Sequence, residues 1–140
     1  MIKAVVFDCF GVVLDVMRGT QIQQTMDLIA ELKSDYKLAM LTNVDSRYAL
    51  DQRFKPGELD ELFEVIVASG EVGWEKPAPE IYVMTVEKLA VEPHECLFID
   101  DIDQFAKAGE GIGMQSYTYV NNQKSIVAIK KILADNKLNI

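Results

Sequence analysis

The run AVVFDCFGV at residues 4–12 decides the fold of this chain. Its first four residues are all apolar, which is typical of a strand buried on both faces of a parallel sheet. The strand ends in the carboxylate of Asp8, and a turn at Gly11 follows. In open α/β sheets, ligands bind beyond the carboxyl ends of the strands. The run therefore predicts a carboxylate at a ligand-binding edge.

Strand-like and helix-like segments alternate along the rest of the chain. Strands are expected at residues 3–8, 37–42, 63–68, 96–100 and 114–119. Helices are expected at residues 21–34, 45–54, from Pro77 and Pro79 to about residue 90, 102–109 and 123–136. This alternation predicts an α/β fold with a mainly parallel sheet of about five strands and helices on both faces. Residues 1–140 are expected to form a single domain, because no repeat or linker interrupts the pattern.

Composition narrows the classes of partner and the compartment. The net charge is −8, with 14 Lys and Arg against 22 Asp and Glu, which argues against a nucleic-acid partner. The two cysteines, Cys9 and Cys96, lie in apolar runs and are expected to be buried free thiols, which favours a reducing, cytoplasmic compartment. Neither a signal peptide nor an apolar run near the ~20 residues of a membrane span is expected, so no membrane partner is predicted.

Polar side chains stand at the carboxyl ends of four successive predicted strands or in the loops that follow them. They are Asp8, Thr42 with Asn43, Lys76, and Asp100 with Asp101. Each has an ordinary explanation on its own, as a helix cap, a turn residue or a solvated loop charge. A parallel sheet brings all four loops to one edge, so together they predict a site.

The chemistry of this set fits phosphoryl transfer. Asp8 would be the nucleophile that forms an aspartyl-phosphate. The hydroxyl of Thr42 and nearby backbone N–H groups would hold phosphate oxygens, and Lys76 would neutralise the transferring group. Asp100 and Asp101 would hold Mg²⁺, a cation that prefers carboxylate oxygens and water.

These motifs resemble those of the haloacid dehalogenase (HAD) superfamily over nearly the whole chain. The resemblance rests on FDCFGV at residues 7–12, LTN at 41–43, Lys76-Pro77 and FIDD at 98–101. It implies a Rossmann-like, three-layer α/β/α sandwich, a Mg²⁺ cofactor and, most often, phosphatase activity. It also implies that the backbone carbonyl of Phe10 binds the metal, together with Asp8, Asp100 and Asp101, and that Thr42 and Asn43 contact the substrate.

The chain departs from the phosphatase pattern at Phe10. Phosphatase members carry Asp at this place, where it protonates the leaving group and then activates water. Loss of a general acid/base typically slows a reaction by about 10²- to 10⁴-fold. Members similar to the dehalogenases proper carry an aromatic residue here and use the same Asp to attack carbon without a metal. The pair Asp100-Asp101, however, resembles the metal-binding form.

The second departure is the missing cap domain. Capped relatives insert helices between the first motif and Thr42, whereas only 33 residues separate Asp8 from Thr42 here. Residues 10–20 are left for a turn and flap, and we hypothesise that residues 15–20 mark a deletion. An uncapped site could accept a phosphorylated small molecule or a phosphoprotein, or be covered by a second subunit of a homo-oligomer.

Three functions follow from these observations. The first is a slow, Mg²⁺-dependent phosphohydrolase that acts through an aspartyl-phosphate on a phosphorylated substrate. The second is a catalytically impaired HAD-fold binding or interaction module. The third, less favoured, is a haloacid dehalogenase, which would release halide without a metal.

Overall fold

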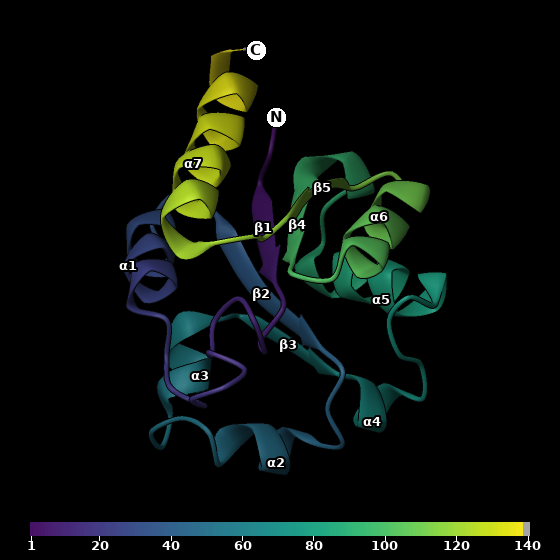
Figure 1. The fold of residues 1–140 in the computed structure, drawn as a ribbon. Helices are drawn as coiled ribbons and strands as arrows, with labels where there is room; N and C mark the ends of the chain where they lie inside the picture. Colours follow the sequence, from purple (N-terminus) through teal and green to yellow (C-terminus); the bar gives the residue numbers. More distant parts are fainter. Residues whose placement is uncertain (139–140) are drawn as a thin grey trace.

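In the computed structural model, which describes residues 1–138, five parallel strands form one sheet in the order β3-β2-β1-β4-β5 (Figure 1). The strands are β1 Ala4–Phe7, β2 Lys37–Thr42, β3 Val65–Ala68, β4 Cys96–Asp100 and β5 Gln115–Thr118. Each pair of neighbours is parallel, so all five carboxyl ends lie at one edge. The predicted parallel sheet is confirmed, and the observed strands lie within the predicted ranges.

The apolar runs form central strands because both of their faces are buried. In β1, Val5 and Phe7 join the core on one face, and Ala4 and Val6 join the core on the other. All four residues are fully buried. Alternation of side chains along a strand means that only an unbroken apolar run can cover two cores at once. This explains why β1 could be recognised from its sequence.

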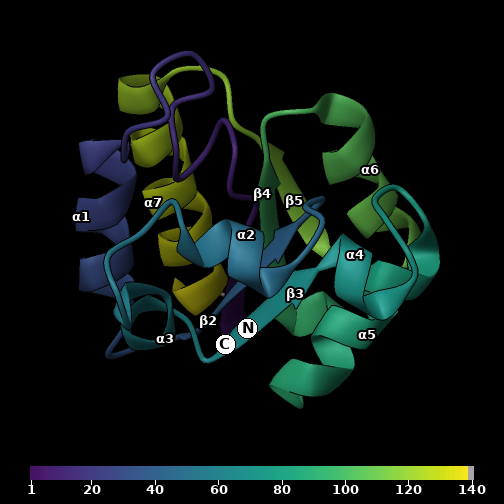
Figure 2. The same ribbon diagram turned by 90° about the horizontal axis from the view of Figure 1, so that it is seen from below.

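Two layers of helices cover the sheet (Figures 1 and 2). Helices α1 (Gln23–Leu32) and α7 (Asn122–Leu138) pack against each other on one face. Helices α5 (Pro79–Leu89) and α6 (Asp103–Gly111) pack together on the opposite face. The result is the predicted Rossmann-like α/β/α sandwich. No helix within residues 1–138 is both long enough and apolar enough to cross a bilayer.

The predicted helix 45–54 is wrong in length. The structure has a shorter α2, Arg47–Asp51, whose start is capped by Ser46 Oγ accepting a hydrogen bond from Ala49 N at 3.0 Å. Three further short elements were not predicted, namely α3 Glu58–Leu62, α4 Ser69–Val72 and the 3₁₀ turn η1 Pro93–Glu95. Each is no longer than five residues, which is too short to show a helical period.

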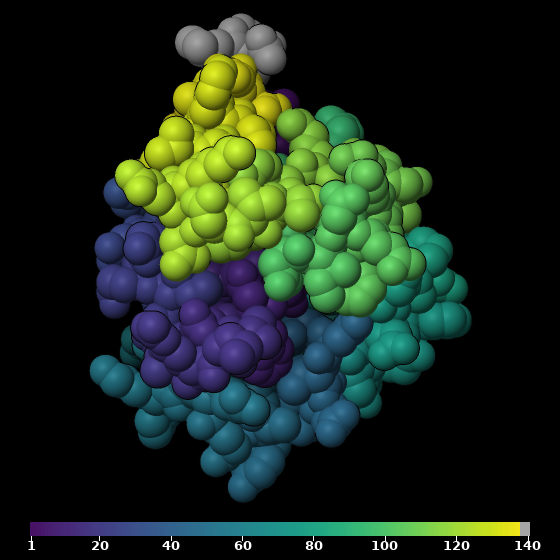
Figure 3. Space-filling model, viewed as in Figure 1, coloured from purple at the N-terminus to yellow at the C-terminus, as the bar shows by residue number. Residues whose placement is uncertain are grey.

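Residues 8–22, between β1 and α1, form a compact loop that contains no helix. The carbonyl of Cys9 accepts hydrogen bonds from the backbone N–H groups of Val12, Val13 and Leu14. The side chains of these three apolar residues are buried. Isolated bridges join Leu14 to Phe10 and to Gln21. We call residues 10–20 the flap. In Figure 3 this purple segment lies against the blue segment that follows β2.

Candidate active site

The structure brings most of the predicted site residues together at the carboxyl edge of the sheet. Asp8 follows β1, Asp100 ends β4, and Lys76 lies in the loop between α4 and α5. The side chain of Lys76 forms hydrogen bonds with those of Asp8 and Asp100, although Lys76 is 68 residues from Asp8 in the sequence. Figure 2 views this edge from below, with α2 and α4 in front.

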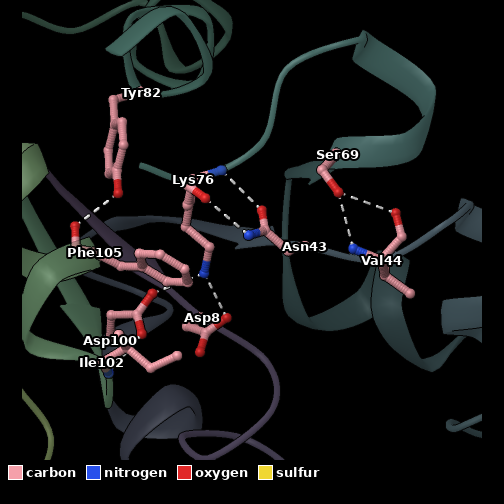
Figure 4. A network of polar contacts seen from close by, with 9 residues as sticks. All are labelled: Asp8, Asn43, Val44, Ser69, Lys76, Tyr82, Asp100, Ile102 and Phe105. Carbon is pink, nitrogen blue, oxygen red and sulfur yellow. Dashed lines mark hydrogen bonds and ion pairs between the residues drawn. The ribbon is translucent and has the colours of Figure 1, made fainter. Parts of the chain in front are cut away.

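Lys76 is the centre of the cluster (Figure 4). Its Nζ donates to Asp8 Oδ1 and to Asp100 Oδ2, both at 2.7 Å. All three residues are buried, with Asp8 the most exposed at 5%. The rings of Phe98 and Phe105 lie 5.7 and 5.4 Å from the same nitrogen, which is cation–π distance. The ammonium is therefore held rigidly in a dry setting where charge interactions are strong.

Asn43 holds the main chain of Lys76 rather than pointing at an open space. Its amide nitrogen donates to the Lys76 carbonyl at 3.1 Å, and its amide oxygen accepts from the Lys76 N–H at 2.9 Å. A second clasp joins the loop after β2 to the first residue of α4, because Ser69 Oγ accepts from Val44 N at 3.0 Å and donates to Val44 O at 3.3 Å. The substrate contact expected of Asn43 stays a prediction, while its observed contacts fix the position of Lys76.

Three carboxylates form a site that fits a small divalent cation. Asp8, Asp100 and Asp101 each offer an oxygen, and these oxygens lie within 4.8 Å of one another. Asp100 Oδ1, the oxygen that does not bind Lys76, accepts a hydrogen bond from Ile102 N at 2.9 Å, which fixes the orientation of the carboxylate. Asp101 Oδ1 is buried and accepts no hydrogen bond from the described residues. An orphaned carboxylate oxygen, and one ammonium against three carboxylates, are the features that a bound Mg²⁺ would satisfy.

Gly11 makes room for Asp101. A Cβ atom at this position would overlap the Asp101 carboxylate, and the backbone φ of 93° lies in the region that favours glycine. The flap can therefore turn tightly against the acidic cluster. The sequence showed a glycine turn here, but its partner Asp101 is 90 residues away and could not be foreseen.

Electrostatics in the cluster are unfavourable without a cation. Burial raises the pKa of Asp8 to about 8, a shift that Lys76 opposes and that the neighbouring carboxylate of Asp100 adds to. Burial likewise raises the pKa of Asp101, with a further contribution from Asp100. A divalent cation would reverse these shifts by favouring the charged carboxylates.

The remaining predicted residues lie at the same edge. Thr42 ends β2, and its hydroxyl is buried without a hydrogen-bond partner among the described residues. Phe10 is half-buried and packs against the core, and its carbonyl accepts no hydrogen bond from the described part of the chain. Both observations leave these oxygens available for a ligand. Cys9 and Cys96 are buried free thiols, as expected.

Arg53 was missed by sequence reasoning. Its guanidinium carbon lies 5.5 Å from the centre of the Phe10 ring, and the side chain is exposed. Arg53 belongs to the segment between α2 and α3, so its place beside the loop that follows Asp8 depends on tertiary packing. No local motif marks it.

The comparisons with known proteins agree with this geometry. A family model described as haloacid dehalogenase-like hydrolase matches residues 20–113. Human N-acylneuraminate-9-phosphatase is 28% identical over 104 residues, which cover 74% of this chain and 41% of the relative. The chain thus spans less than half the length of that relative. The matched range begins after Asp8 and Phe10, but the structure places Asp8 in direct contact with Lys76, which lies within that range.

Solved structures show the same fold. A HAD phosphatase from Thermococcus onnurineus superposes with a TM-score of 0.80 at 18% identity, covering 94% of this chain and 98% of that chain. A variant of a HAD family enzyme from Bacteroides thetaiotaomicron, in complex with magnesium and inorganic phosphate, gives a TM-score of 0.74 at 18% identity, covering 86% and 95%. Because the family model matches more than half of the length of this chain, the chain belongs to the haloacid dehalogenase-like hydrolases.

Proposed function

We propose that the protein is a Mg²⁺-dependent phosphohydrolase that forms an aspartyl-phosphate on Asp8. One observation carries this proposal, namely the ammonium of Lys76 held at 2.7 Å from both Asp8 and Asp100. Asp101 completes a carboxylate cluster beside it. A nucleophile, a fixed positive charge and a cation site then meet at one point, as phosphoryl transfer requires.

Each residue has a distinct task in the first step. A carboxylate oxygen of Asp8 attacks phosphorus, and the bond from phosphorus to the leaving oxygen breaks. Lys76 orients Asp8 and offsets negative charge on the transferring group, while the Thr42 hydroxyl donates to a phosphate oxygen. Mg²⁺, when held by Asp8, Asp100, Asp101 and the Phe10 carbonyl, would lower the repulsion between the carboxylate and the phosphate.

Phe10 makes the proposed reaction selective and slow. It supplies no proton to the departing oxygen, so aryl and acyl phosphates should react faster than alkyl phosphates. It also supplies no base for the water that attacks the aspartyl-phosphate in the second step. The covalent intermediate should therefore accumulate.

We propose a phosphorylated small molecule as the substrate, acted on by a single-domain, capless core. The relative named above is a phosphatase of N-acylneuraminate 9-phosphate by its name, which supports a phosphorylated carbohydrate or acid. A phosphoprotein substrate and a homo-oligomer that covers the site remain hypotheses. The buried free thiols favour a cytoplasmic location.

Intact mass and phosphate release together test the proposal. Incubation with an aryl phosphate and Mg²⁺ should release phosphate slowly and add the mass of one phosphoryl group. Asp8→Asn should abolish both signals, and removal of Mg²⁺ with a chelator should suppress both. A parent protein that binds Mg²⁺ but shows neither adduct nor turnover with aryl or acyl phosphates would contradict phosphoryl transfer.

The aromatic Phe10, which supplies no acid/base and lies beside the exposed guanidinium of Arg53, favours one second candidate, a binding module that has lost catalysis. Phe10→Asp restores the missing acid/base, and Phe10→Leu serves as the matched variant without a carboxylate. Strong Mg²⁺-dependent activity in Phe10→Asp, absent from both the parent and Phe10→Leu, identifies the parent as a disabled enzyme. Halide release without metal would instead identify a dehalogenase.

A further inference from the structure

Arg53 carries a charge that has no ion-pair partner among the described residues and lies beside the loop that follows Asp8. The guanidinium of Arg47, by comparison, is paired with Asp51 at 3.2 Å and with Asp60 at 3.0 Å. Arg53 forms no ion pair or side-chain hydrogen bond within the described residues, although the chain has a net charge of −8. An exposed guanidinium that stays unpaired in an acidic protein is available to bind an anion.

Two neighbours fix the position of Arg53. Its guanidinium lies over the face of Phe10, and Nη1 lies 3.7 Å from where a Cβ atom on Gly19 would be. Both neighbours belong to the flap. A guanidinium held over an aromatic ring still has N–H groups that can form two parallel hydrogen bonds with a carboxylate or phosphate.

Arg53 lies beside the loop that follows Asp8. Phe10 follows Asp8 by two residues, and two residues span at most about 7 Å between Cα atoms. The segment that carries Arg53 leaves the carboxyl end of β2, the edge at which the carboxylate cluster lies. One small substrate could therefore place its phosphoryl group at Asp8 and a second charged group at Arg53.

We propose that Arg53, supported by the ring of Phe10, binds a second anionic group of the phosphorylated substrate, either a carboxylate or another phosphate. This inference rests on the proposed phosphohydrolase function. It makes Arg53 a specificity-determining residue and assigns the substrate to the phosphorylated acids or the bisphosphates. It also gives Phe10 a task, because an Asp in its place would offer no aromatic face to the guanidinium.

Matched pairs of ligands test this proposal by direct binding. Asp8→Asn, loaded with Mg²⁺, serves as a non-reacting background for calorimetry. The carboxylate pair is gluconate 6-phosphate and sorbitol 6-phosphate, and the phosphate pair is fructose 1,6-bisphosphate and fructose 6-phosphate. In each pair only one ligand carries a second anionic group. The pair in which that ligand binds more tightly than its partner is called the preferred pair, and it shows whether Arg53 binds a carboxylate or a phosphate.

Adding Arg53→Gln to this background should weaken binding of the doubly anionic ligand of the preferred pair by about 10- to 100-fold. Binding of its singly anionic partner should change by less than about 2-fold. Arg53→Lys keeps the charge but not the planar fork, so it should give an intermediate loss. Lys88→Gln is the matched control for charge, because Lys88 is exposed at the end of α5, at the opposite edge of the sheet.

Equal losses for both members of a pair would place Arg53 on the reacting phosphate and overturn the proposal, as would no loss for either. Phosphate release by the otherwise unmodified protein is measured in parallel. If the binding preference depends on Arg53 but no phosphate is released, the anion site stands and the proposed catalysis fails. If phosphate is released without any preference, catalysis stands and the role of Arg53 is wrong.

Discussion

Lys76 shares a single positive charge between two buried carboxylates, and the site depends on this imbalance. Asp8 and Asp100 each lie at 2.7 Å from its nitrogen, and Asp101 adds a third acid. The ammonium offsets only part of the charge, which leaves the cluster in need of a cation. At the scale of single residues, structure and proposed catalysis therefore rest on the same few atoms.

Lys76→Met should destabilise the protein and abolish turnover. The substitution leaves two buried acids without the ammonium that they share, and breaking a buried ion pair in this way costs about 3–5 kcal/mol. Urea unfolding at pH 7 measures the loss, and Mg²⁺ should recover part of it by neutralising the acids. Lys88→Met, at an exposed position, should change the unfolding free energy little. Unaltered stability of Lys76→Met would show that the ion pairs are not formed in solution.

At the scale of elements, a clasp of hydrogen bonds joins the loop after β2 to the segment that runs from the start of α4 to the loop before α5. Asn43 fixes the main chain of Lys76, and Ser69 fixes that of Val44 (Figure 4). Gly70 permits the close approach, because a Cβ atom there would overlap the carbonyl of Asp45. The clasp connects two segments that no local sequence pattern joins, and it sets where the ammonium stands.

Asn43→Leu should lower kcat far more than it changes KM. It removes both hydrogen bonds to Lys76 and leaves a buried N–H and carbonyl unpaired, at a cost of about 1–3 kcal/mol for each group. Steady-state kinetics with an aryl phosphate measures the effect. Ser69→Ala breaks the neighbouring clasp without touching Lys76 and should reduce kcat less. A rise in KM with unchanged kcat would instead indicate that Asn43 binds substrate directly.

Gly11→Ala should weaken Mg²⁺ binding as well as stability. The added Cβ overlaps the Asp101 carboxylate, and the left-handed backbone costs about 1–2 kcal/mol for a residue other than glycine. Gly73→Ala is a matched control, because Gly73 also has a positive φ but has open space around its Cβ position. Calorimetric titration with Mg²⁺ should separate the two variants. Equal affinities would mean that Gly11 serves the backbone alone.

The sequence was most informative where one residue type had one physical reason to be there. The unbroken apolar run of β1 could be predicted because burial on both faces dictates it. The meeting of Asp8 with Asp100 could be predicted because parallel strands bring their carboxyl ends to one edge. The break of helix 45–54 after Asp51 and the short α3 could not, since they follow from packing onto the core. Arg53 escaped prediction for the same reason, as its neighbour Phe10 is 43 residues away.

At the scale of the whole molecule, the strand order places the site where the chain reverses direction across the sheet. The chain builds outward from β1 through β2 to β3, then returns to add β4 on the other side of β1. Asp8 directly follows β1 and Asp100 ends β4, and these two strands flank the switch point at which open α/β sheets form a crevice. Global stability and metal binding are therefore coupled through the central strands.

The metal-free protein should lose stability as the pH rises from about 4 to 8. The folded-state pKa of Asp8 is raised to about 8, so within this window the folded protein holds a proton that the unfolded chain releases. This contribution is fully present below pH 3.8 and is lost as the pH passes 8. Urea unfolding in a chelating buffer measures the slope, which Asp8→Asn should flatten. An identical slope in both proteins would contradict the raised pKa.

Mg²⁺ binding should strengthen over the same pH range, because the metal must displace the proton from Asp8. Calorimetry in two buffers with different ionisation enthalpies should detect proton release at pH 6.5 and less of it at pH 9. Thermal stabilisation by Mg²⁺ should grow with pH in parallel. Proton-independent binding would mean that Asp8 is already ionised in the metal-free protein.

The central place of β1 also has a consequence during synthesis. This first strand pairs with β4, whose residues emerge from the ribosome about 90 positions later. A nascent chain that ends before Cys96 leaves one side of β1 open, with backbone groups ready to pair with another chain. Asp8 meets Asp100 and Asp101 only after that gap closes, so Mg²⁺ affinity in a series of truncated chains should report when the sheet is complete.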